Sequence, residues 1–404
     1  MAWIVKKLFV NRNIALVFWG QVISQAGDSI YQIGLLWLCL DLTGSKSLTG
    51  LIASAAFFPY LLFALPGGAI SDRFSRKSIM ISSDAVRLLL VACIPVLYAL
   101  DAISILVLAL LTFLIESFSA VFYPARDALL PDLASSEDLP HANALIQTSW
   151  QLAVLLGPAL AALLLPWVGL RHLFTFDAFT FLISMLAIAG IHLARPPPGR
   201  PPPAKPWREM LGGVRYVATD PLMRIIVIVT ALDNLILMGP AIVGIPIYVK
   251  EVLKLDAAHY AWVQAALAGG IFIGAPLMAV FGKKAPLGKI LLIGVVLDGL
   301  TYLLLFFACT FWATVFTIFI HSFFIPMITV SRATLIQRCA PPEFQGRVFS
   351  IVQMCVVGGT ALSSILTGLI AEKVSMPWIY LGMALLAAST ALPGFLSKAI
   401  RGAR

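Results

Sequence analysis

Charged side chains are scarce in this chain of 404 residues, since Asp, Glu, Lys and Arg together make up only 12% of it. Cysteine and histidine are scarcer still, with five of each, and the cysteines lack the paired spacing of a zinc site or a disulfide framework. No polar stretch is long enough for a catalytic domain, and we find no nucleophile–base pairing and no phosphate-binding loop. We therefore expect no enzymatic activity, no metal site and no cofactor.

Apolar sequence, in contrast, fills the chain almost from end to end. A bilayer core about 30 Å thick requires roughly 20 residues of helix, and twelve stretches reach that length. Barrel strands would alternate apolar and polar residues, which these stretches do not. The sequence predicts an all-α polytopic membrane protein with twelve transmembrane helices. The expected spans are 13–40, 49–71, 79–100, 103–124, 142–165, 172–193, 222–249, 259–281, 287–308, 310–331, 347–371 and 377–397.

The basic residues predict the orientation of these spans. If both termini are cytoplasmic, the inside segments hold 22 of the 28 Lys and Arg and the outside loops hold five. This asymmetry is the positive-inside signature. It predicts a multi-pass protein of a bacterial cytoplasmic membrane with both termini cytoplasmic. The net charge of +9 then faces anionic membrane lipids, and we expect no nucleic-acid partner.

A proline-rich linker separates the chain into two halves. Residues 195–206 contain seven prolines and three basic residues, which is typical of a stiff spacer. We expect an N-terminal domain at 1–194, a cytoplasmic linker at 195–221 and a C-terminal domain at 222–404. The apolar face that follows the prolines predicts either a short interfacial helix or an extension of the seventh span.

The two halves resemble each other at a constant offset of 206 residues. This offset aligns Arg126 with Arg332 and Asp28 with Asn234. Several matches on one gapless offset predict two repeats of six helices each.

The loop after the second span carries a spaced motif. Gly68 is followed at four residues by Asp72 and Arg73, and at eight by Arg76. This spacing resembles the signature loop of the major facilitator superfamily. The resemblance implies twelve helices in two six-helix bundles around a central cavity. It also implies a cytoplasmic gate, for which we expect Gly68, Asp72, Arg73, Arg76, Arg126 and Asp127. The corresponding loop of the second half, at 281–284, lacks the acid.

Further segments resemble one branch of that superfamily. They read FWGQxxSxxGD from residue 18, SDxxR from residue 83 and ARDALLPDL from residue 125. Together they are similar to drug:proton antiporters that include macrolide-efflux and enterobactin-export proteins. The resemblance covers the whole chain and implies export of an amphipathic small molecule, such as a drug or siderophore, by proton antiport and alternating access. We expect a monomer whose partners are this substrate, protons and membrane lipids.

The fifth span contains Gly157 and Pro158 in the pattern Gly-Pro-x-x-Ala-Ala. It resembles the antiporter signature Gly-Pro-x-x-Gly-Gly, with alanine in place of both trailing glycines. We expect a kink and close helix packing here.

Ionisable residues within the spans are the candidates for proton coupling, because such groups are costly in a bilayer. In the superfamily that the chain resembles, the first, fourth, seventh and tenth helices line the cavity. Each carries one such group here, namely Asp28, Glu116, Asp233 and His321. A lone intramembrane histidine is more commonly a structural residue.

Polar neighbours at helical spacing accompany these groups. Gln21, Gln25, Asp28 and Gln32 fall on one stripe of the first helix. Similar spacing predicts polar stripes on the fourth and tenth helices. The substrate cavity is therefore expected to involve Gln21, Gln25, Gln32, Thr112, Tyr123, Asn234 and Thr317.

Depth in the membrane predicts which groups pair. Arg87 and Glu116 lie at similar depths and are expected to form a buried ion pair. No cation is expected at the depth of Asp28, which makes it the preferred coupling acid, with Asp233 second. Asp177 and Asp298, on peripheral helices, are expected to make hydrogen bonds between helices.

Three alternatives remain open at this stage. The same fold could serve a lysophospholipid flippase. A metal exporter of ferroportin type would use Asp28 and His321 as ligands, but no His/Cys cluster supports it. A receptor-like protein without transport is disfavoured by the intact first gate motif.

Overall fold

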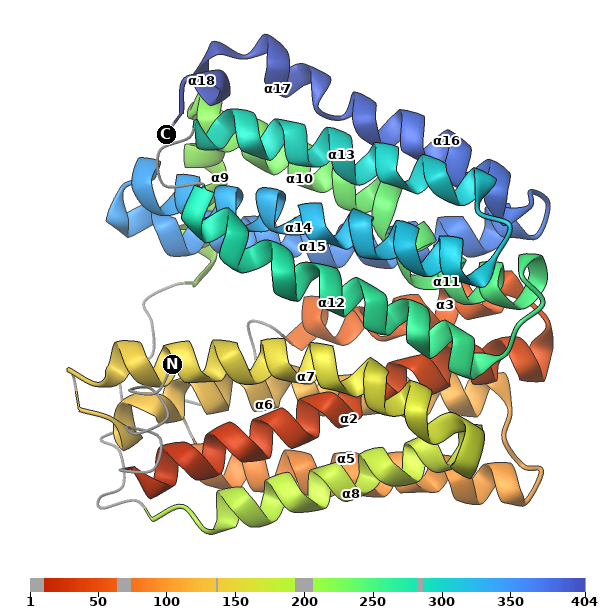
Figure 1. Ribbon diagram of the computed structural model, residues 1–404. Helices are drawn as coiled ribbons and strands as arrows, with labels where there is room; N and C mark the ends of the chain where they lie inside the picture. Colours follow the sequence, from red (N-terminus) through yellow and green to blue (C-terminus); the bar gives the residue numbers. More distant parts are fainter. Residues whose placement is uncertain (1–10, 64–73, 136, 193–205, 282–285, 404) are drawn as a thin grey trace. The chain divides into compact units, whose positions relative to one another are not determined.

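The computed structural model describes residues 11–63, 74–135, 137–192, 206–281 and 286–403, and all regular structure in these ranges is helical (Figure 1). The first half contains α2 (Arg12–Thr43), α3 (Lys46–Ala55), α5 (Arg76–Ala99), α6 (Ile105–Leu133), α7 (Leu139–Val168) and α8 (Leu170–Ala189). The second half contains α9 (Pro206–Thr219), α10 (Pro221–Gly239), the π-helical turn η1 (Pro240–Gly244), α11 (Ile245–Ile247), the π-helical turn η2 (Tyr248–Val252), α12 (Ala257–Phe281), α13 (Leu287–Phe307), α14 (Phe311–Cys339), α15 (Pro342–Ala371), α16 (Met376–Ser389), α17 (Leu392–Leu396) and α18 (Lys398–Arg401).

Eleven helical segments among the described residues are long and apolar enough to cross a membrane. The helix α2, with 32 residues, is long enough but is not among them. Its stripe of Gln21, Gln25, Asp28 and Gln32 lowers its mean hydropathy. The predicted all-helical membrane architecture is confirmed, and the first of the twelve expected spans is the most polar one.

The chain forms two compact units. The first comprises Met1–Leu42 and Phe58–Pro202, and the second comprises Thr43–Phe57 and Pro203–Arg404. In the first unit α5 packs along α6 and α8, and buried apolar side chains such as Met80, Phe122 and Leu145 form a core. In the second unit α12 and α13 pack along α14, and α10 packs along α15.

The segment that carries α3 belongs to the second unit, although the sequence analysis assigned it to an N-terminal domain at 1–194. Here α3 lies along α15, and a Cβ at Gly50 would lie 3.1 Å from the Cα of Gly368. The serines at the start of α3 bind Glu372, which accepts from the Ser45 hydroxyl at 2.8 Å and from the Ser47 backbone N–H at 2.9 Å. Small residues therefore allow close contact between α3 and α15, and the Glu372 carboxylate accepts hydrogen bonds at the N-terminus of α3.

Side-chain caps set several helix starts. The Ser75 hydroxyl accepts from the Ser78 N–H at the start of α5, and Ser104 does the same for Val107 at α6. Asp220 is extended and caps α10 through the Met223 N–H. Because Asp220 interrupts the helical backbone, α9 is a separate helix and not an extension of the seventh span.

Candidate functional site

The polar stripe of α2 provides the first side chains of the candidate site. Gln21 and Gln25 are buried, and the Gln25 side-chain amide donates to Gln21 Oε1 at 3.0 Å. Gln32, further along the helix, donates to Glu116 Oε1 on α6 at 3.3 Å. The stripe therefore extends along the first unit and reaches one of the predicted coupling acids.

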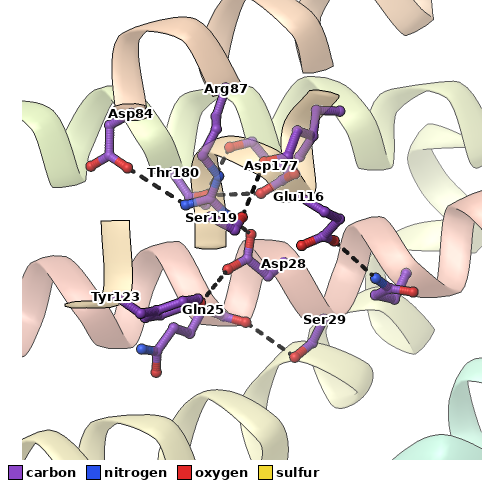
Figure 2. Close-up of polar contacts among 12 residues, drawn as sticks. Gln25, Asp28, Ser29, Asp84, Arg87, Glu116, Ser119, Tyr123, Asp177 and Thr180 are labelled. Carbon is purple, nitrogen blue, oxygen red and sulfur yellow. Dashed lines mark hydrogen bonds and ion pairs between the residues drawn. The ribbon is translucent and has the colours of Figure 1, made fainter. Parts of the chain in front are cut away.

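Asp28 forms an ion pair with Arg87 of α5. The distance between Arg87 Nη2 and Asp28 Oδ1 is 2.6 Å, and the Tyr123 hydroxyl donates to Asp28 Oδ2 at 3.4 Å (Figure 2). Arg87 Nη1 also lies 3.6 Å from Asp84, one turn earlier on the same helix. The guanidinium stacks over the Phe181 ring at 4.0 Å. Arg87, only 2% exposed, is thus held by two carboxyls and an aromatic ring.

The predicted partner of Arg87 was wrong. We expected Glu116 at ion-pair distance and no cation near Asp28, whereas Arg87 pairs with Asp28. Glu116 instead accepts hydrogen bonds from neutral donors, Gln32 and the Tyr60 hydroxyl, the latter at 3.2 Å. Depth along the membrane was the basis of the prediction, but partner choice also depends on the rotation of each helix about its axis.

Asp177 of α8 joins this cluster because α2 and α8 approach each other at Gly27. A Cβ at Gly27 would overlap the side chains of Asp177 and Thr180, so only glycine permits this approach. Thr180 donates within its own helix, to the Asp177 carbonyl at 2.7 Å and to Asp177 Oδ1 at 3.2 Å. Asp177 was expected to make a hydrogen bond between helices, whereas the donor to its carboxylate, Thr180, lies on the same helix.

Four carboxyls therefore gather around one guanidinium, as Figure 2 shows for Asp28, Asp84, Glu116, Asp177 and Arg87. Asp84 and Asp177 are fully buried, at 0% and 1% exposure, whereas Asp28 and Glu116 are only partly buried. Sequence reasoning missed Asp84 as a member. Its spacing of three residues from Arg87 was the available signal.

A pocket of about 440 Å³ lies next to the cluster in the first unit. Its lining consists of Tyr60, Tyr123, Arg126, Ile146, Gln147 and Trp150. The guanidinium of Arg126 lies 4.9 Å from the centre of the Tyr123 ring, and its Nη1 donates to Gln21 Oε1 at 3.1 Å. Of the residues expected to line the cavity, Tyr123 lines this pocket directly. Thr112 instead bonds to the Tyr31 hydroxyl at 2.9 Å, inside the helix packing.

The expected cytoplasmic gate is described only in part. Gly68, Asp72 and Arg73 lie outside the described residues. Arg76 Nη1 forms an ion pair with Asp132 Oδ2 at 2.5 Å and also donates to the Ala128 carbonyl at 2.9 Å. Arg126 contacts its neighbour Asp127 at 2.7 Å. Asp132, at the end of α6, is a partner that the sequence analysis did not assign to the gate.

The second unit has its own buried polar groups. On α10, Asp233 is 7% exposed, and the Asn234 side chain donates to the Thr230 carbonyl at 2.8 Å. His321 Nδ1 lies 3.0 Å from the Thr301 hydroxyl and 3.4 Å from Asp298 Oδ1. The described structure thus brings His321 to Asp298 of α13, while Thr317 is buried on the same helix as His321. The first unit, in contrast, holds the larger cluster of acids.

The Gly157–Pro158 motif lies where α7 meets α2. A Cβ at Gly157 would come within 2.7 Å of the Ala26 carbonyl oxygen, so the glycine permits close packing beside the polar stripe.

Comparison with known proteins identifies the family. Residues 9–400 match the family described as transmembrane secretion effector. The multidrug efflux pump Tap of Mycolicibacterium fortuitum is 26% identical over 379 residues, which cover 92% of each protein. Macrolide efflux protein A of Streptococcus pyogenes is 22% identical, over 88% of this chain and 89% of that protein.

Solved structures show the same fold. A bacterial homologue of the iron transporter ferroportin in an inward-facing state superimposes with a TM-score of 0.77 at 14% identity, over 95% of this chain and 98% of that one. At this identity the likeness concerns the fold alone. The chain is not an enzyme: it is a multi-pass membrane transporter of the major facilitator superfamily and belongs to its transmembrane secretion effector family.

Proposed function

We propose that this transporter exports amphipathic small molecules by exchange for protons, through alternating access. The observation that carries the proposal is the surplus of carboxyls around Arg87. A buried carboxylate is costly unless a cation compensates it. One guanidinium compensates about one carboxylate, so the remaining acids of the cluster are stable in the membrane when they hold protons. A transporter that exchanges protons needs acids that hold a proton within the membrane.

Glu116 is the acid that we propose exchanges its proton during transport. Asp84 and Asp177 are fully buried, at 0% and 1% exposure. Asp28 is accessible but forms an ion pair with Arg87 at 2.6 Å, and breaking a buried pair costs about 3–5 kcal/mol. Glu116 is accessible and has neutral hydrogen-bond partners. We therefore place Glu116 before Asp28 as the coupling acid, with Asp233 as the candidate of the second unit.

Two tyrosines would couple these acids to the substrate. Tyr60 and Tyr123 both line the pocket, and their hydroxyls donate to Glu116 and Asp28 respectively. A carboxylate holds such a hydroxyl more strongly than a protonated carboxyl does. Protonation of Glu116 would release Tyr60 and change the shape of the pocket. Substrate and proton would then favour different positions of Tyr60 in the pocket lining, as antiport requires.

The pocket lining supports an amphipathic substrate. Three aromatic rings and Ile146 offer apolar contacts, while Gln147 and Arg126 offer polar ones. Its volume of about 440 Å³ lies within the range of small-molecule sites, roughly 300–1,000 Å³. The relatives named as a multidrug efflux pump and a macrolide efflux protein point to the same class of substrate.

The direct test is proton-driven transport in proteoliposomes. A fluorescent cationic dye and a macrolide serve as substrates, with and without an imposed pH gradient. We expect Glu116→Gln to abolish accumulation against a gradient and to preserve downhill exchange, because the amide mimics the protonated acid. Asp101→Asn, which changes an exposed acid in the loop before α6, is the matched control and should behave as wild type.

Several outcomes would contradict the proposal. If Glu116→Gln concentrates the dye as wild type does, coupling resides elsewhere, and Asp28, Asp233 and His321 become the candidates. If wild-type transport ignores the pH gradient, proton antiport is wrong. If the protein reorients a fluorescent lysophospholipid without a gradient and does not move the dye, the lipid-flippase alternative replaces it.

We further propose that the protein lies in a bacterial cytoplasmic membrane with both termini cytoplasmic. Two native cysteines allow a test, because Cys309 between α13 and α14 and Cys339 at the end of α14 are both exposed. In variants that retain one of them, an impermeant maleimide added to whole cells should label Cys309 only. Labelling of Cys339 and not of Cys309 would show that the protein has the opposite orientation in the membrane.

A further inference from the structure

A long apolar groove runs along the surface of the first unit, on the same two helices that contribute Arg87 and Asp177 to the acid cluster. It lies between α5 and α8 and has a volume of about 620 Å³. Small residues, Ala92 and Ala99 of α5 and Ala178 of α8, line it, and Pro95 interrupts the hydrogen bonding of α5 beside it. The groove therefore exists because small side chains and a proline leave space between two helices.

The groove has the length of one lipid leaflet. Its lining on α5 extends from Leu88 to Leu100, about 18 Å at 1.5 Å per residue. Half of a bilayer core is about 15 Å. Neighbouring apolar side chains on both helices are exposed, including Leu89 at 63% and Phe179 at 59%. These two helix faces are therefore expected to contact lipid, and the groove fits a single acyl chain.

An arginine and a histidine lie at one end of this groove. Arg171 and His172, in the first turn of α8, belong to its lining. The N-cap of α8, Gly169, provides no side-chain hydrogen bond, so the first-turn backbone N–H groups add positive potential. Trp167, 88% exposed and four residues before Arg171, is typical of the level of lipid head groups.

Arg171 is also exceptional in the charge distribution. In the predicted topology it is one of five basic residues on the outer side, with Lys46, Lys250, Lys254 and Lys373. The other four fall in the second unit. The positive-inside pattern gives no reason for an arginine here, whereas a phosphate group at the end of the groove does.

We propose that this groove is a binding site for an anionic phospholipid of the outer leaflet. One acyl chain would lie along α5 and α8, and the phosphate would bind the Arg171 guanidinium, whose Nε donates to His172 Nε2 at 3.1 Å, and the backbone N–H groups at the start of α8. The charge of the head group matches the basic end, and the apolar length matches the chain.

Thermal unfolding of the detergent-purified protein, titrated with phosphatidylglycerol or with phosphatidylcholine of the same chains, tests the site. We expect phosphatidylglycerol to bind wild type more tightly and to raise the unfolding temperature more. Arg171→Gln should weaken binding of phosphatidylglycerol roughly fivefold, which corresponds to about 1 kcal/mol per basic residue at an anionic surface. Lys373→Gln, which removes another outer cation, should leave it unchanged.

A second pair of variants separates the groove from the charge. Ala92→Phe fills the groove and should remove the response to both lipids, whereas Leu89→Phe adds the same ring to an exposed position outside it and should respond as wild type. Equal binding of the two lipids to wild type, an unchanged preference in Arg171→Gln, or a full response in Ala92→Phe would each overturn the proposal.

Discussion

Removal of Asp28 tests the Arg87–Asp28 ion pair, because the two partners respond differently to the loss of the other. Asp28→Asn leaves Arg87, 2% exposed, without its closest carboxylate. An arginine does not deprotonate in proteins, so Arg87 must turn to Asp84, now 3.6 Å away. Removal of one partner of a buried pair costs about 3–5 kcal/mol, and the alternative partner places Asp28→Asn at the lower end.

The expected shift in unfolding temperature follows from the size of the unit. A domain of 150–250 residues shifts by roughly 2–4 °C per kcal/mol, so about 3 kcal/mol corresponds to about 6–12 °C. Thermal unfolding of the purified protein at one fixed scan rate measures this shift. The double variant Asp28→Asn/Arg87→Met should recover much of the stability, since neither charge remains. Asp101→Asn, an exposed matched control, should shift by less than about 2 °C, because surface changes stay within about 0.5 kcal/mol.

One result would refute this reasoning. If Asp28→Asn unfolds within about 2 °C of wild type and the double variant is no more stable than the single one, the pair does not stabilise the unit. The assignment of Glu116 as the exchanging acid would then lose its main argument, because Asp28 would be free to exchange.

Three further predictions concern other contacts. Gly27→Ala should lower the stability of the first unit by about 1–3 kcal/mol in thermal unfolding, because the added Cβ would overlap side chains of α8. Gly382→Ala, where a Cβ meets open space, should have little effect. Equal effects of the two substitutions would contradict the close approach of α2 and α8. The backbone N–H of Ser47 and the Ser45 hydroxyl lower the pKa of Glu372, so the Glu372 carboxylate stabilises the folded protein above the ordinary pKa of about 4.5, and this stabilisation is lost as the pH falls through the lowered pKa. Glu372→Gln should therefore flatten the pH dependence of the unfolding temperature below about pH 5, and an unchanged slope would contradict this role. Arg76→Asp should reduce transport, and the added substitution Asp132→Arg should restore part of it, because the ion pair re-forms with the charges exchanged. A double variant as inactive as Arg76→Asp would show that transport does not depend on this ion pair.

The spans, the polar stripes and the family resemblance could be predicted from the sequence, because they depend on residue type and helical spacing alone. Apolar runs of sufficient length leave few alternatives in a bilayer. Spacings of three and four residues place side chains on one face of a helix whatever surrounds it. The stripe from Gln21 to Gln32 and the candidate acids Asp28 and Glu116 therefore follow from the sequence alone.

The partners of those side chains were decided by the tertiary structure. Whether Arg87 meets Asp28 or Glu116 depends on how each helix is rotated about its axis, and depth alone does not determine that rotation. The contribution of α8 depends on the close approach at Gly27, and Tyr60 reaches Glu116 from a segment 56 residues away in sequence. Ion pairs and hydrogen bonds act over a few ångströms, so the order of the candidate acids follows only from the packed helices.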